Sequence, residues 1–317
     1  MQKITPKAAF DVVNGQASAL HEDWPGAKPS EGYRWLHFDV SEPTFSAWTQ
    51  QHLPRVASAS LLQQETRPRL EALRDGFILN LRGVNLNPNS DPEDMVTVRL
   101  WVTEASVISA QVRRVFAIEA MQDAMLSSVP PATVGQFVSD LAFKLVTRIE
   151  TVSLELEERT DALEEQVSDG TMINQEELTN LRQSVIKLRR FVNPQRDAIA
   201  SLAEQRGLFL DEERDLVRET SNRTRRTVEE LDATRERLIA LQDRLDAVGA
   251  EVIGRNGYIL SIVAAIFLPL GFFTGLFGVN VAGMPGVETP WAFAALTGVS
   301  LLSGIALYAL FKFAKWL

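Results

Sequence analysis

The sequence predicts an α+β membrane protein in which a mixed α/β domain is followed by long helices and by two C-terminal transmembrane helices. Three patterns lead to this prediction. Short apolar runs separated by turn residues fill residues 1–130. Apolar residues at spacings of three, four and seven then dominate residues 131–253. Residues 254–317 hold two long runs without charge. We expect these three ranges to be the domains.

The composition narrows the function classes. The chain has 317 residues, of which 45% are hydrophobic and 23% charged. It contains no cysteine, which excludes disulfides and thiolate metal sites, and its net charge of −9 argues against a nucleic-acid partner. The N-terminus has no apolar core of signal-peptide length, so we expect no export. The sequence has no phosphate-binding glycine loop, no HExxH and no GxSxG, so we expect neither an enzyme nor an ATP-driven pump.

The first 130 residues indicate strands with one helix among them. Four segments are rich in apolar residues and bounded by turn residues, namely AFDVV from Ala9, YRWLHFDV from Tyr33, GFILNLRGVNL from Gly76 and MVTVRLWVTEASVISAQV from Met95. The segment LLQQETRPRLEAL from Leu61 predicts a helix that breaks at Pro68. The three histidines, His21, His37 and His52, lack the spacing of metal ligands, and we expect no metal or catalytic role for them.

After Pro130 and Pro131 the pattern becomes helical. Two segments separated by the loop SDGTMINQ are expected to pair as an antiparallel hairpin. Their apolar positions are Val138, Leu141, Leu145, Ile149, Val152, Leu156 and Leu163, then Leu178, Leu181, Val185, Leu188 and Val192.

A third helix is expected to run without interruption from about Glu212 into the membrane. Residues 212–279 would measure on the order of 100 Å at ~1.5 Å per residue. Its seam comprises Val217, Thr220, Thr224, Thr227, Leu231, Thr234, Leu238, Leu241, Leu245, Val248 and Val252. Such a helix either couples the preceding domain mechanically to the bilayer or is a plain coiled-coil stalk.

The two uncharged runs, residues 258–279 and 291–313, are each long enough to cross a bilayer. A pair of buried core helices is the alternative, but two adjacent runs of this length are rarely core. The connection of about ten residues carries only Glu288, while Arg255 and Lys312 lie at the other ends of the runs, as does Lys315. Because positive residues stay on the cytoplasmic side, we expect an antiparallel hairpin with both termini in the cytoplasm.

One face of the first span is made of small residues. Its members are Gly254, Gly257, Ser261, Ala264, Leu268, Gly271, Gly275 and Gly278. Such a face predicts either close helix packing, as in GxxxG pairs, or a pore lining with exposed backbone. Pro269 leaves the carbonyl of Ala265 without its helical donor, and in a membrane that group needs protein, water or an ion. Two spans cannot enclose water, so a pore would need several copies.

The small face continues toward the N-terminus of the same helix through Ala240, Asp243, Ala247 and Ala250. If this face surrounds an axis, Asp243 and Glu236 point into a vestibule, where carboxylates raise the local cation concentration. A solvated outer surface explains the same charges equally well.

Together these features resemble one family. A cytoplasmic α/β domain, a long helix that enters the membrane, Gly278-Val279-Asn280 at its end and a second C-terminal span resemble the CorA superfamily of divalent-cation transporters. The tripeptide there is Gly-Met-Asn, or Gly-Val-Asn in the ZntB zinc-transporter branch. The stretches that look like this branch are IFLPLGFFTGLFGVN (266–280), AGMPG (282–286), RRFVNPQRD (189–197), ETRPRL (65–70) and the final KWL. Gly286 stands where magnesium-type relatives commonly have Glu, which favours the ZntB branch.

The resemblance implies a homopentamer with the first spans around the pore, the second spans outside and a cytoplasmic funnel. By position, Gly278 and Val279 would hold the turn and Asn280 would supply a ring of amide oxygens for a hydrated ion. Leu268 would be the constriction. The remaining pore-lining positions would be Gly257, Ser261, Ala264, Gly271 and Gly275.

For the cargo, the resemblance implies Zn²⁺ taken up across the inner membrane of a bacterium, with no permanently bound cofactor and with lipid around the spans. Dehydrated zinc prefers His and Cys ligands, which are nearly absent, so we expect the ion to pass hydrated and Co²⁺, Ni²⁺ or Cd²⁺ to compete. A magnesium or cobalt channel of the same architecture is one alternative. A membrane-tethered coiled-coil scaffold or sensor is another.

Overall fold

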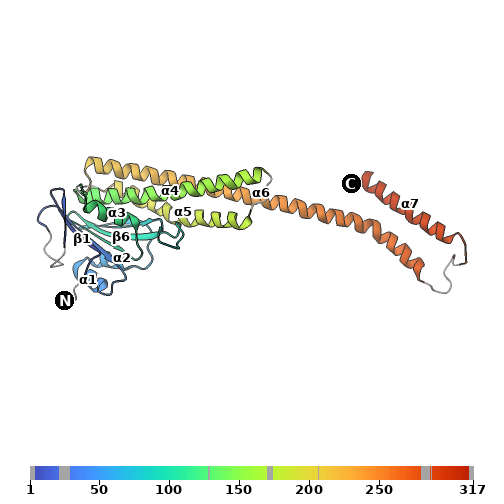
Figure 1. Cartoon of the computed structure of the whole chain (residues 1–317), viewed down its shortest axis with the longest axis horizontal. Helices are drawn as coiled ribbons and strands as arrows, with labels where there is room; N and C mark the ends of the chain where they lie inside the picture. Colours follow the sequence, from blue (N-terminus) through green and yellow to red (C-terminus); the bar gives the residue numbers. More distant parts are fainter. Residues whose placement is uncertain are drawn as a thin grey trace. The chain divides into compact units, whose positions relative to one another are not determined.

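The structure is a computed structural model that describes residues 4–20, 29–127, 129–169, 174–205, 207–279, 286 and 288–313. The chain divides into two compact units, Met1–Leu241 and Gln242–Leu317. The first unit holds a seven-stranded sheet and most of the helices, and the second holds the end of one long helix and the helix after it (Figure 1).

The sheet is mixed. Its strands are β1 (Ala8–Val13), β2 (Gln16–Ala19), β3 (Tyr33–Asp39), β4 (Arg69–Leu73), β5 (Gly76–Gly83), β6 (Val96–Thr103) and β7 (Ser106–Gln111). They lie in the order β2-β1-β3-β7-β6-β5-β4, and every neighbouring pair is antiparallel except β3 and β7. The four predicted strand segments are confirmed, and MVTVRLWVTEASVISAQV forms the hairpin of β6 and β7.

Side-chain alternation gives the sheet two apolar faces. In β5, Phe77, Leu79 and Leu81 belong to one core cluster while Ile78 belongs to the other, as period two requires. Helices α1 (Phe45–His52) and α2 (Arg55–Leu62) cover the Ile78 face. Helices α3 (Phe116–Met125), α4 (Val134–Ser168) and α5 (Gln175–Ala203) cover the other face (Figure 1).

The helix predicted in the segment from Leu61, with its break at Pro68, is wrong beyond Leu62. Helix α2 ends at Leu62, and Arg69–Leu73 is strand β4, which pairs antiparallel with β5 through Leu70 and Leu79. A proline disfavours the helical conformation of the residue before it, which works against a helix that continues up to Pro68. After Pro68, pairing with the buried strand β5 determines the extended conformation. Strand β2 and helix α1 were not predicted. Asn14 and Gly15, both at positive φ, form the tight turn that leads into β2.

The predicted long helices are confirmed. Helix α4 begins just after Pro131, where the Thr133 hydroxyl accepts the amide of Gln136 at 2.9 Å. Helix α6 (Asp211–Gly278) runs for 68 residues with Pro269 inside it. In the first unit its predicted seam is buried from Val217 to Leu241. Ion pairs join α6 to the hairpin, Arg223 to Glu150 on α4 and Arg189 on α5 to Asp232.

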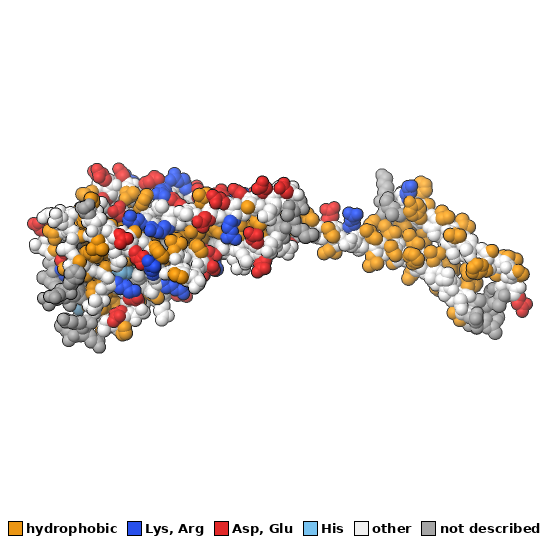
Figure 2. Space-filling view, viewed as in Figure 1, with side chains coloured by type: hydrophobic (Ala, Val, Ile, Leu, Met, Phe, Trp, Pro, Cys, Tyr) orange, Lys and Arg blue, Asp and Glu red, His pale blue; other side chains and the backbone are white. Residues whose placement is uncertain are grey.

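The second unit contains two helices that are long and apolar enough to cross a membrane. They are the last part of α6 and α7 (Ala292–Phe313), whose most apolar windows have mean hydropathies of 2.3 and 1.8. None of either window (0%) is buried inside the structure, whereas a core helix of a soluble protein would be mostly buried. Figure 2 shows hydrophobic side chains over much of the visible surface of this unit. These observations favour the predicted spans over the buried-core alternative.

Candidate ion pathway

The six predicted pore-lining residues all lie on α6 within the second unit. Gly257, Ser261, Ala264, Leu268, Gly271 and Gly275 are exposed without exception. Leu268 has 78% of its side-chain surface exposed, although it is a large apolar residue. Gly278, the last helical residue, and Val279 are exposed as well. Asn280, to which the sequence assigned the metal-facing amide, lies outside the described residues.

A different face of the same helix is covered. The partly buried positions of the span are Ile262, Ala265, Ile266, Pro269, Leu270 and Phe273, at the three- and four-residue spacing of one helix face. Helix α7 has a matching pattern, with less exposed positions that include Ala292, Leu296, Ser300, Ser303, Leu307 and Phe311. Because α7 is the other described helix of this unit, we infer that this partly buried face of α6 is turned toward α7. The small face is left free.

The glycines of the small face have no packing neighbour among the described residues. A Cβ placed on Gly257, Gly271, Gly275 or Gly278 would meet no atom within 4 Å there. GxxxG pairs normally let two helix backbones approach each other closely. Within the described part of the chain, no second helix approaches Gly271 and Gly275 in this way. Close packing against another described element of the chain therefore does not explain why these residues are small.

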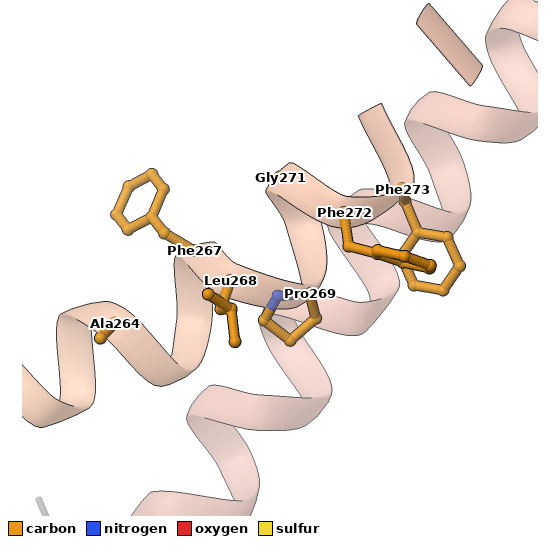
Figure 3. Close-up of a pocket in the computed structure, with 7 residues that line it drawn as sticks. All are labelled: Ala264, Phe267, Leu268, Pro269, Gly271, Phe272 and Phe273. Carbon is orange, nitrogen blue, oxygen red and sulfur yellow. The ribbon is translucent and has the colours of Figure 1, made fainter. Parts of the chain in front are cut away.

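Around Pro269 the helix offers backbone oxygen beside an apolar surface. The proline nitrogen carries no hydrogen, so the carbonyl of Ala265 lacks its usual helical donor. Residues 264–273 of α6 border a shallow apolar hollow of about 830 Å³, open on one side. Figure 3 shows Leu268 and Pro269 on one side of the ribbon and the ring of Phe267 pointing away from them.

Two hydroxyls on the span bind the backbone of their own helix. The Ser261 hydroxyl donates to the carbonyl of Gly257 at 2.9 Å. The Thr274 hydroxyl lies 2.9 Å from the carbonyl oxygen of Leu270 and 3.2 Å from that of Gly271. Thr274 is not among the residues predicted from the sequence to line the pathway. The signal available in the sequence was a hydroxyl side chain within a long apolar run, because a polar side chain in such a run needs a hydrogen-bond partner.

The predicted vestibule carboxylates, Glu236 and Asp243, are both exposed on α6. Neither takes part in a hydrogen bond or ion pair with the described residues, whereas nearby Arg237 is held by Asp161 and Glu164 on α4. Their exposure is compatible with both interpretations of the sequence, a vestibule wall and a solvated surface.

No protein-built zinc centre is present in the described ranges, where no group of three or more His, Cys, Asp or Glu could hold a metal ion. His37 is buried in the sheet with Nδ1 2.8 Å from the Ser109 hydroxyl, and burial lowers its pKa to about 4. His52 stacks on Trp48 and its Nδ1 lies 2.8 Å from the Trp48 carbonyl oxygen. His21 lies outside the described residues. Both described histidines thus make contacts inside the fold, and the expectation that neither binds a metal stays a prediction.

Residues 30–312 match the family of CorA-like Mg²⁺ transporter proteins. This chain belongs to that family. Zinc transport protein ZntB of Yersinia enterocolitica is 32% identical over 288 residues, 89% of this chain and 88% of the relative. Divalent cation transporter CmaX of Pseudomonas aeruginosa is 35% identical over 291 residues, 89% and 87% of the two chains. The structure of full-length CmaX superimposes with a TM-score of 0.84 at 31% identity and covers 98% of both chains. The resemblance stated from the motifs is thus confirmed at the level of the family.

The fold also explains two of the motif stretches that carried the resemblance. In RRFVNPQRD, the Phe191 ring lies 3.7 Å from the guanidinium of Arg82, and the Gln195 side chain accepts the Arg82 amide at 2.6 Å. In ETRPRL, the Thr66 carbonyl accepts from the same guanidinium at 2.8 Å. Both stretches hold α5 and the chain before β4 against strand β5. They have a structural role, separate from the ion pathway.

Proposed function

We propose that five copies of this chain form a pore that conducts divalent cations, zinc foremost, across the cytoplasmic (inner) membrane of a bacterium. The single observation that carries the proposal is the exposed small face of α6. In the second unit one face of α6, with Ile262, Ile266 and Phe273, is partly covered, whereas the small residues of the predicted pore face are exposed and their glycines meet no neighbour among the described residues. A free face of glycine, serine and alanine next to an unbonded carbonyl is poorly suited to lipid and well suited to hydrated ions.

In this arrangement the three parts of the chain have distinct roles. Residues 1–130 and 131–253 form a cytoplasmic funnel with both termini in the cytoplasm, and residues 254–317 form the membrane part. The spans 258–279 surround the pore and the spans 291–313 separate them from lipid. Leu268 is the apolar constriction, while Asp243 and Glu236 attract cations into the vestibule.

The outer mouth is formed by Gly278, Val279 and Asn280. Five amide oxygens of Asn280 would bind a hydrated divalent ion through its water shell, since amide oxygen suits hard or hydrated cations. Stripped zinc would need nitrogen or sulfur ligands, and the sequence provides only three histidines and no cysteine. Hydrated passage makes Co²⁺, Ni²⁺ and Cd²⁺ competitors of zinc.

Zinc is favoured as cargo by two observations. The relative from Yersinia enterocolitica is named a zinc transport protein, and Gly278-Val279-Asn280 has valine where magnesium-type members have methionine. A magnesium or cobalt channel is the second candidate, because the family description names Mg²⁺. A non-transporting scaffold fits poorly with membership in a transporter family.

Zinc entry into proteoliposomes loaded with a zinc-responsive dye tests the proposal. Saturable zinc flux that excess magnesium barely slows is the expected result. Magnesium flux that dominates would transfer the protein to the second candidate, and the absence of flux of either ion would refute the transport proposal. The same liposomes, prepared with and without a proton gradient at a clamped potential, reveal what drives the flux.

Asn280→Ala tests the amide ring. We expect zinc flux to fall about tenfold or more while pentamer assembly persists, because the substitution removes only one side-chain amide per subunit. Asn256→Ala is the matched control, since it removes the same amide from α6 outside the motif. Equal flux in wild type and Asn280→Ala would eliminate the asserted role of the ring.

A further inference from the structure

The first unit contains a pocket at the carboxyl ends of β3 and β7. These are the two parallel neighbours of the sheet. The chain leaves β3 to form α1 on one face and leaves β7 to form α3 on the other. In open α/β sheets, the crevice where neighbouring connections part in this way is the usual position of a ligand.

The pocket has a volume of about 400 Å³, and its walls are mostly polar. It is lined by Lys7, His37, Gln111, Arg114, Ile118, Glu119 and Gln122. The floor is buried, with His37 1% and Gln111 6% exposed. The rim carries the charges, since Lys7 and Arg114 are about half exposed. Polar side chains are rarely buried without a partner, so two buried polar residues beneath two cations indicate a binding pocket rather than an ordinary solvated surface.

The carboxylates near this pocket already form ion pairs with its cations. Both oxygens of Glu119 accept from Arg114, through its Nε and, at 2.6 Å, its Nη2. Asp39, at the end of β3, binds the Lys7 ammonium at 2.6 Å. The side-chain oxygen Oε1 of Gln111 accepts the Val115 backbone amide at 3.1 Å. The acceptors of the pocket are thus largely occupied, and they hold the two cations in position.

Several hydrogen-bond donors of the pocket, in contrast, have no acceptor among the described residues. Within the described ranges, Arg114 Nη1 and the side-chain amide of Gln122 have no hydrogen-bond partner, and Lys7 uses one of its three hydrogens. An oxyanion is the ligand that satisfies several donors at once, and charge-assisted bonds from guanidinium and ammonium are the strong ones.

His37 gives this pocket an internal reporter. Its ring is neutral near pH 7, because burial, and then the positive charge of Lys7, lower the pKa to about 4. Asp39 opposes this shift, and the Ser109 and Gln111 contacts oppose it to a smaller degree. Its Nε2 has no hydrogen-bond partner among the described residues. A negative charge above the floor would favour the imidazolium and move the titration upward.

We propose that this pocket binds the phosphate or carboxylate group of a small soluble anion. Arg114 and Lys7 are the charged donors, and the amides of Gln111 and Gln122 complete the donor set. Glu119 competes with the anion for Arg114 and so limits its affinity. The site lies outside the ion pathway and would give the transporter a means of responding to a solute other than the transported cation.

Calorimetric titration of the full chain in detergent with inorganic phosphate, and in parallel with acetate, tests the proposal at ionic strength held constant with sodium chloride. We expect saturable phosphate binding. Arg114→Gln should weaken it about tenfold, because the positive charge and the free Nη1 donor are lost, and Glu119→Gln should strengthen it severalfold, because the competing carboxylate is lost. General electrostatic attraction would change the affinity in the same directions, so charge changes at neighbouring positions outside the pocket are needed to separate it from a specific site.

Two neighbours provide matched controls. Arg113→Gln and Asp123→Asn make the same charge changes one residue before Arg114 and one turn after Glu119, at exposed positions that do not line the pocket. We expect neither to change phosphate affinity by more than about twofold. If the controls shift the affinity as much as the pocket variants do, or if no saturable binding occurs up to the millimolar range, the proposal is wrong.

A second readout is the titration of His37, followed by NMR of the chain labelled with ¹³C-histidine. The expected result is an upward shift of the His37 pKa when phosphate replaces chloride, with no such shift in Arg114→Gln. A His37 titration that is identical in phosphate and in chloride would overturn the assignment even if heat is released, because the anion would then bind elsewhere.

Discussion

The two parts of helix α6 have opposite surroundings. In the first unit its seam, from Val217 to Leu241, is buried against its own chain. In the second unit the continuation of the same seam is open, with Val248 54% and Val252 53% exposed. The residue types along the seam are similar on both sides of this point. The difference is therefore one of available partners, because α4 and α5 cover only the first part.

The comparison extends to how each part satisfies its polar groups. The buried threonines of the first part each donate to the carbonyl four residues earlier, as Thr224 does to Thr220 at 2.7 Å. They bury hydroxyls without needing a partner on another helix. In the second part, the carbonyl freed by Pro269 has no such internal donor. The first part satisfies these polar groups within its own helix, whereas in the second part the carbonyl of Ala265 is left for protein, water or an ion.

The largest expected effect comes from filling the free face. Gly275→Phe should reduce zinc flux by about two orders of magnitude or more, because five rings would close an apolar constriction against water. Gly298→Phe, on α7, is the matched control, since a Cβ at this glycine also meets nothing within 4 Å. Dye-loaded proteoliposomes give the rates.

We expect the Gly298→Phe variant to retain flux within about twofold of wild type, because α7 is assigned to the outer ring. Equal loss of flux in both variants would mean that any bulky substitution disturbs the membrane part, and the distinction between the two faces would be lost. Retained flux in Gly275→Phe would place the pathway elsewhere.

The next effect contrasts a glycine from each unit. In Gly135→Ala the new Cβ would fall against the Glu213 carboxylate and 2.7 Å from the Leu208 carbonyl oxygen. Glu213 is itself buried and accepts the Leu210 amide at 2.8 Å, so it cannot easily move. We expect a loss of about 1–3 kcal/mol in the free energy of unfolding of the first unit.

In Gly271→Ala the new Cβ meets no atom of the described chain, and alanine has the higher helix propensity. We expect unchanged stability or a gain of less than about 1 kcal/mol. Thermal unfolding in detergent, followed by tryptophan fluorescence, compares the two variants. A destabilisation of Gly271→Ala as large as that of Gly135→Ala would contradict the open face.

The third effect is a pH dependence confined to the first unit. The pKa of His37 is lowered from 6.5 to about 4, so below pH 6.5 the unfolded chain takes up a proton that the folded chain does not. Its contribution to stability is complete above about pH 6.5 and is lost progressively as the pH falls, by about 3 kcal/mol at pH 4.

His37→Asn should remove this part of the slope, because asparagine keeps a polar atom near Ser109 and does not titrate. The measurement is the unfolding midpoint of both proteins in denaturant between pH 7 and pH 4. Parallel profiles for the wild type and His37→Asn would show that other groups carry the acid sensitivity.

Much of this fold was predictable because local patterns and tertiary packing agree. The heptad spacing from Val138 to Leu238 places the same residues in the core that the structure buries. The segment from Leu61 to Leu73 was not predictable in this way. Its helical composition extends past Leu62, and only the pairing of Leu70 with Leu79 makes its end a strand.

The exposed small face of α6 was predictable from the sequence, while its role as an ion pathway stays a prediction. The small face could be read from the spacing of Gly257, Ser261 and Gly271, and the motif 278–280 from the resemblance. The sequence could not decide which face of α6 meets α7, because both faces are apolar enough. The pocket beside His37 was not foreseen either, since its lining comes from four separate segments between Lys7 and Gln122.

The smallest expected effect concerns the charge on α6 at the start of the second unit. Asp243 is exposed and makes no ion pair in the described part of the chain, so no neighbouring group neutralises its charge. If it faces a vestibule, Asp243→Asn lowers zinc flux about twofold at low ionic strength, and the difference disappears near physiological salt as screening shortens the range of the field. Glu251→Gln removes an equally exposed carboxylate from another face of the same helix and should leave flux unchanged. A solvated outer surface predicts that the two variants behave alike. The ratio of their rates at low salt therefore decides between the two interpretations of these carboxylates.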